Sequence, residues 1–181
     1  MSRFSWIQTF VVIASFFGVA VSVVDAGIIL STPVGLSDGD TFRFVFVTSA
    51  TRDATSSNIL DYDAFVNSDV ASFGGAVYAG QAVTDWKVIG STRYVNAIDH
   101  VAVASESGAY KGVYLPNGAK VADSDQAGLN HSLFGYPLYV SINQTLDGVY
   151  KQGELPVWTG SSYYGFGNFA DYSPESVSYT H

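Results

Sequence analysis

Residues 42–49 read Phe-Arg-Phe-Val-Phe-Val-Thr-Ser, and this stretch decides the fold class. Its three phenylalanines alternate with arginine and valine, and period-two placement of aromatic and β-branched residues is typical of a β-strand. Apolar side chains occupy both faces of this stretch, so we expect a central strand of a sheet. Residues 48–57 are mostly polar and predict a loop after the strand.

A helix is predicted directly after that loop. Asn58, with Asp61 three residues later, resembles an N-cap followed by an acidic residue in the first turn. Apolar side chains then recur at helical spacing, and Gly74-Gly75 ends the pattern. The predicted apolar face consists of Ile59, Tyr62, Phe65, Val66 and Val70.

Short apolar runs separated by turn residues follow the helix. Residues 113–115 and 120–122 flank Pro116-Asn117-Gly118, and Asn-Gly is a strong hairpin signal. Further strands are expected at 86–89, 137–142 and 155–159. No charge block or long linker divides the chain. We therefore predict a single α+β domain with a mainly antiparallel sheet and one principal helix.

The first 26 residues have the features of a signal peptide. Arg3 precedes the uncharged apolar run 10–24, and Val24-Asp25-Ala26 offers small residues for cleavage after Ala26. An uncleaved anchor is the less favoured alternative, because no basic cluster follows the run. We expect residues 27–181 to form one extracellular domain, secreted or at the cell surface, with no membrane span in the mature chain.

Composition argues against several function classes. The 181-residue chain has 8 Lys+Arg against 16 Asp+Glu, a formal net charge of −8. Nucleic acid is therefore not an expected partner, since Lys and Arg supply most of that affinity. The absence of cysteine excludes disulfides, thiol nucleophiles and Cys-based zinc sites. A cysteine-free exported domain must be held by packing or a bound ion, and it favours a bacterial source.

The sequence contains no recognised catalytic motif. The pentapeptide G-x-S-x-G and the zinc motif H-E-x-x-H are both absent. Residues 112–120 differ from a phosphate-binding loop in spacing and are interpreted as the hairpin. Asp99 next to His100 leaves open a hydrolase whose base is His100. A loop histidine with a polar neighbour is the favoured interpretation, and no catalytic residue is predicted.

Paired aspartates suggest a metal site. Asp123 and Asp125 flank Ser124, and aspartates in turns are a common source of calcium ligands. We single out Asp123 and Asp125 as candidate calcium ligands. Asp61 and Asp63 form a similar pair, but their place at a predicted helix start favours stabilisation of the helix dipole.

Aromatic residues crowd the Gly-rich C-terminal segment. Tyr163 and Tyr164 are the candidate ligand-binding residues there, because flat rings stack on sugars and anchor protein interfaces. The alternative is that these two tyrosines only cover a sheet. Trp158 lies in an apolar run and is interpreted as core.

Several short segments, taken in order, resemble the ectodomains of exported bacterial PEP-CTERM-type proteins. They are Gly39-Asp40-Thr41-Phe42-Arg43 with the strand that follows, Ile89-Gly90-Ser91-Thr92 and Val157-Trp158-Thr159-Gly160. The same order resembles, more distantly, the endostatin branch of the C-type-lectin-like fold. This resemblance implies a lectin-like arrangement. That fold places further strands after the Trp-Gly segment, so the chain either lacks C-terminal strands or closes its sheet differently.

Export, acidity and the missing catalytic set together predict a non-enzymatic binding or surface module. The expected ligand is a glycan or an extracellular protein, with calcium as the one candidate cofactor. Two alternatives stay open: an exported hydrolase with an unrecognised polar site, and a purely structural component of an extracellular matrix.

Overall fold

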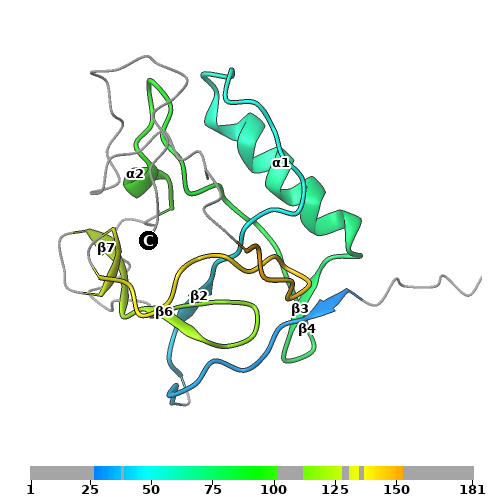
Figure 1. Cartoon of the computed structure of the whole chain (residues 1–181), viewed down its shortest axis with the longest axis vertical. Coiled ribbons are helices and arrows are strands. Elements are labelled where there is room, and N and C mark those ends of the chain that lie inside the picture. Colours follow the sequence, from blue (N-terminus) through cyan, green and yellow to red (C-terminus); the bar gives the residue numbers. More distant parts are fainter. Residues whose placement is uncertain (1–26, 38, 102–111, 128–130, 135–136, 153–181) are drawn as a thin grey trace, which may run out of the picture.

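The computed structural model describes residues 27–37, 39–101, 112–127, 131–134 and 137–152 (Figure 1). Its elements in chain order are β1 (Ile28–Ile29), β2 (Phe42–Phe44), α1 (Ile59–Ser72), β3 (Ala76–Tyr78), β4 (Gln81–Val83), α2 (Ala97–Val101), β5 (Gly112–Tyr114), β6 (Lys120–Ala122), β7 (Ser124–Ala127) and β8 (Ser132–Phe134). The predicted signal peptide, the predicted strand 155–159, Tyr163 and Tyr164 lie outside the described residues. Within the described ranges, no helix is both long and apolar enough to cross a membrane.

Helix α1 confirms the predicted helix. The Asn58 side chain accepts a hydrogen bond from the Leu60 amide at 3.2 Å, as an N-cap residue does. The helix ends before Gly74 and Gly75, which both have positive φ values. Its buried residues are Ile59, Tyr62, Val66, Asp69 and Val70. Four of the five predicted residues are therefore buried, whereas Phe65 is only half-buried and the Asp69 side chain belongs to the buried face.

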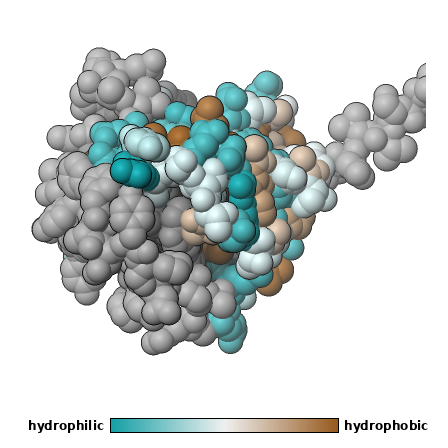
Figure 2. Space-filling model, turned by 90° about the horizontal axis from the view of Figure 1, so that it is seen from above, coloured by the Kyte–Doolittle hydropathy of each residue, from teal (hydrophilic) through white to brown (hydrophobic). Residues whose placement is uncertain are grey.

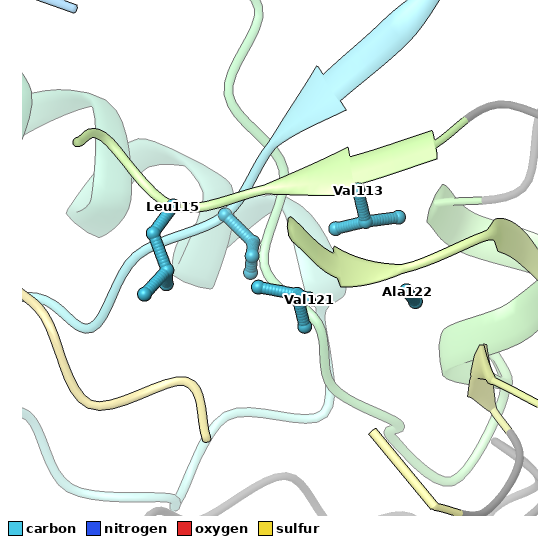
Figure 3. Packing of buried hydrophobic residues seen from close by; sticks show 5 residues of the cluster. Val113, Leu115, Val121 and Ala122 are labelled. Atoms are coloured by element: carbon cyan, nitrogen blue, oxygen red, sulfur yellow. The ribbon is translucent and has the colours of Figure 1, made fainter. Parts of the chain in front are cut away.

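The predicted hairpin is also confirmed. Strands β5 and β6 pair antiparallel, and β2 pairs parallel with β5, which gives the order β2-β5-β6. Among the described residues β2 pairs with β5 alone, so the expected central position is not found there. The main core cluster lies across this sheet (Figure 3) and consists of Val45, Val113, Leu115, Val121 and Ala122.

A second small sheet has the order β1-β3-β4, in which β3 and β4 form a hairpin that the sequence analysis missed. The strand expected at 86–89 is wrong, because this segment is irregular. Trp86 explains its apolar character without strand pairing. The indole packs edge-on against Phe46 at 5.0 Å between ring centres, and its N–H donates to the Val83 carbonyl.

The third sheet pairs β7 with β8 in parallel. The strand expected at 137–142 is wrong, since β8 lies before that run and residues 137–142 form bends. Leu138 and Ile142 pack against the main core cluster, which accounts for their apolar character.

The described fold is α+β, with one principal helix and a second, shorter helix. Three strand pairings are parallel and two are antiparallel among the described residues, so its small sheets are mixed. Helix α1 lies along one side of the molecule, away from β7 (Figure 1).

Candidate functional site

Four polar or aromatic residues meet where β6 turns into β7, and we call them the Tyr139 cluster: Lys120, Asp123, His131 and Tyr139. Lys120 begins β6, Asp123 lies between β6 and β7, and His131 directly precedes β8. Two backbone hydrogen bonds hold the segments together. The Asp123 amide donates to the His131 carbonyl at 2.6 Å, and the Tyr139 amide donates to the Val121 carbonyl at 2.9 Å.

The side chains of the cluster fix the ring of Tyr139. Its hydroxyl donates to Asp123 Oδ2 at 2.7 Å, and Lys120 Nζ lies 2.5 Å from Asp123 Oδ1. The His131 imidazole stacks on the ring at 4.1 Å between centres, with an interplanar angle of 3°. Tyr139 nevertheless remains 49% exposed. The cluster therefore fixes the ring of a half-exposed residue, with His131 stacked on the ring and Lys120 Nζ 5.9 Å from its centre.

The charges of the cluster support one another. The hydrogen bond from Lys120, followed by that from Tyr139, lowers the pKa of Asp123 below its ordinary value of 3.8. The same contacts with Asp123 raise the pKa of Lys120 and that of Tyr139. At neutral pH a carboxylate, an ammonium group and an un-ionised phenol therefore lie together at the edge of the ring.

His131 carries two unfavourable features. Its φ is 53°, a left-handed conformation that is uncommon for a residue with a Cβ atom. Its Nδ1 atom is buried and has no hydrogen-bond partner within the part of the chain that the structure describes. Strained backbone and unsatisfied polar groups each cost free energy, and such strain gathers at functional sites. These features lie on the residue that supports Tyr139.

The two predicted calcium ligands have separate cationic partners. Asp123 faces Lys120, whereas Asp125 Oδ2 lies 2.6 Å from Arg43 Nε. Asp125 is only 5% exposed, and its ion pair connects β7 to β2. No group of three or more His, Asp or Glu residues is placed to hold a metal ion within the described ranges. A calcium ion that used both carboxylates would have to compete with Lys120 and Arg43, and this site stays a prediction.

His100 does not lie in a loop, and its partner is not Asp99. It belongs to α2, and its Nε2 atom lies 2.9 Å from Asp63 Oδ1 on α1. Asp99 instead accepts a hydrogen bond from the Asn96 side chain at 2.8 Å. The interpretation of Asp63 as a helix-dipole residue missed this long-range contact, for which the local sequence holds no signal.

Sequence reasoning found Asp123 but missed the rest of the Tyr139 cluster. Tyr139 was placed inside a predicted strand, and His131 has no distinctive neighbours. The predicted binding residues Tyr163 and Tyr164 lie outside the described residues, so the structure does not relate them to the cluster.

Other aromatic rings are also exposed. Tyr94 is 74% exposed and has the Arg93 guanidinium 5.7 Å from its ring centre. Figure 2 shows one face of the molecule, on which hydrophobic and hydrophilic residues are interspersed.

Comparisons of the chain with protein-family models, curated proteins and solved structures found no match.

Proposed function

We propose that this protein is an exported, non-enzymatic binding module that holds a glycan against Tyr139. The observation that carries the proposal is that Tyr139 is half-exposed, while its ring is fixed through its hydroxyl by Asp123 and through stacking by His131. An aromatic face suits the apolar C–H face of a sugar. A ring that is already held in place loses little conformational entropy when a ligand binds.

The polar neighbours favour a glycan over a protein as the ligand. Sugar hydroxyls both donate and accept hydrogen bonds, and the cluster offers a carboxylate that accepts and an ammonium group that donates. The core of a protein interface is instead depleted in charged residues. Lys120 and Asp123 lie directly beside the ring, so the cluster lacks such an apolar core.

Features of the sequence support the same proposal independently. The predicted signal peptide and the net charge of −8 suit an extracellular acidic domain. The resemblance to the lectin-like fold is consistent with a sugar ligand. A protein ligand and a purely structural role remain the competing interpretations.

A glycan array probed with the secreted protein tests the proposal. We expect binding to at least one glycan, and we expect Tyr139→Ala to weaken it by about tenfold, the equivalent of one lost aromatic stacking contact. Tyr94→Ala is the matched control, because Tyr94 is more exposed yet lies outside the cluster. Equal loss in both variants, or full binding by a folded Tyr139→Ala protein, would contradict the proposal.

Two further variants separate the alternatives. The double variant Tyr163→Ala/Tyr164→Ala tests the surface that the sequence predicted. If it abolishes binding while Tyr139→Ala does not, the ligand is held by the C-terminal segment instead. A hydrolytic activity that His100→Ala removes without unfolding the protein would favour the exported hydrolase.

A further inference from the structure

Asn117-Gly118 is the one Asn-Gly pair in the sequence, and it forms the tip of the β5–β6 hairpin. An Asn-Gly pair is chemically labile because glycine has no side chain, which leaves its own backbone nitrogen accessible to the asparagine side chain before it. Hydroxide takes the Gly118 amide proton, the nitrogen attacks Asn117 Cγ and a C–N bond forms. The Cγ–Nδ2 bond then breaks, and the departing nitrogen takes a proton from water and leaves as ammonia. Water then opens the resulting succinimide, so that asparagine plus water becomes aspartate or isoaspartate plus ammonia.

The fold holds the leaving nitrogen, the side-chain oxygen and the attacking nitrogen of this reaction in hydrogen bonds. Asn117 Nδ2, the leaving group, donates to the Tyr150 hydroxyl at 2.7 Å. Asn117 Oδ1 accepts from the Ala119 amide at 3.0 Å. The attacking Gly118 nitrogen donates its proton to the Leu115 carbonyl at 2.9 Å. Asn117 itself is exposed, so water and hydroxide reach it once these contacts open.

We propose that Asn117 is a site of spontaneous deamidation and that Tyr150 is the latch that keeps it closed. The side chain must rotate before Cγ can meet the Gly118 nitrogen, and this rotation breaks the bond to Tyr150. The latch is itself anchored on the loop that follows. Tyr150 pairs with Gln144 in an isolated bridge, and Gln144 Oε1 accepts from the Asn117 amide at 3.1 Å. Opening of this loop therefore exposes Asn117 to reaction.

The two products have different consequences. Aspartate at 117 keeps an oxygen for the Ala119 amide and loses only the donor to Tyr150. Isoaspartate inserts a methylene group into the main chain beside Gly118. A Cβ atom on Gly118 would lie 2.6 Å from the Thr32 carbonyl oxygen, and the φ angle of Gly118 is +84°. This tightly packed turn has no room for a longer backbone, so isoaspartate separates the hairpin tip from residues 31–34.

The test follows deamidation by peptide mapping and mass spectrometry of the folded protein in mildly alkaline buffer. We expect Tyr150→Phe to deamidate at Asn117 roughly five-fold faster than the wild type, the effect of one lost hydrogen bond on the open population. Tyr94→Phe is the control, because it removes a hydroxyl from an exposed tyrosine elsewhere, and its rate should match the wild type.

A synthetic peptide of residues 115–120 supplies a second, independent comparison. The wild-type protein should deamidate far more slowly than this peptide, and thermal melts should show that Tyr150→Phe is folded. Equal rates in the wild type and Tyr150→Phe would overturn the latch. A wild-type rate equal to that of the peptide would overturn protection by the fold, whatever the variant does.

Discussion

The His100 imidazole on α2 lies 2.9 Å from the Asp63 carboxylate on α1, although 37 positions separate the two residues. The same Asp63 oxygen accepts the Val88 amide proton at 2.8 Å. The two side chains are only 10% and 15% exposed. The Asp63 carboxylate therefore connects α1 both to α2 and to the irregular segment before α2.

We expect Asp63→Ala to lower the free energy of unfolding by about 1–3 kcal/mol, because it leaves a half-buried amide and an imidazole without their hydrogen-bond partner. The corresponding fall in melting temperature is several degrees. Asp99→Ala is the control, since Asp99 is exposed and accepts from a neighbouring side chain only. Thermal melts followed by circular dichroism measure both variants. Equal falls in melting temperature would show that the Asp63 contacts stabilise the fold no more than the exposed contact of Asp99.

Local signals explain what the sequence could predict. The Asn58 cap and the spacing of apolar residues defined α1, and Asn117-Gly118 defined the β5–β6 hairpin. Each of these signals lies within the element that it predicts. Helix propensity, capping and turn chemistry act over a few residues, so a single sequence records them.

Long-range packing explains the errors. The runs 86–89 and 137–142 look like strands because they are apolar, but they pack on the core without forming strands. The Tyr139 cluster depends on β6, β7 and β8 meeting in space. Arg43 and Asp125 are 82 positions apart, and nothing in the sequence near either residue identifies its partner.

Removing Arg43 alone should cost more stability than the Arg43–Asp125 ion pair contributes, because it leaves Asp125 as an unpaired buried charge. Arg43→Met would leave the Asp125 side chain, which is 8% exposed, without its cation, and we expect a loss of roughly 3 kcal/mol. Arg43→Met/Asp125→Leu should recover most of the loss, because no buried charge then remains. Urea denaturation measures both variants. A single variant as stable as the wild type would show that water or another group solvates Asp125.

Acid should break the Tyr139 cluster only below the pH range in which ordinary aspartates take up a proton, because Asp123 has a lowered pKa. The folded-state pKa of Asp123 lies below its unfolded value, so its stabilisation is present above the unfolded pKa. It is lost as the pH falls through the folded pKa. Since Asp123 is exposed, we expect Asp123→Asn to cost only about 0.5 kcal/mol near neutrality. The difference between variant and wild type, measured by thermal melts, should vanish in strong acid, and a constant difference would contradict this assignment.

The effect of calcium removal on the melting temperature distinguishes the metal site predicted at Asp123 and Asp125 from the ion pairs seen in the structure. A bound calcium ion would make the melting temperature fall by several degrees on addition of EDTA, because a ligand stabilises the state that binds it. Lys120 and Arg43 already neutralise the two carboxylates, so we expect the melting temperature to stay unchanged.

The double variant Lys120→Met/Arg43→Met is the informative comparison. Removing both cations leaves two unpaired carboxylates, and this variant should be stabilised by added calcium if their geometry suits the ion. A fall in the melting temperature of the wild type on addition of EDTA would instead support the predicted calcium site.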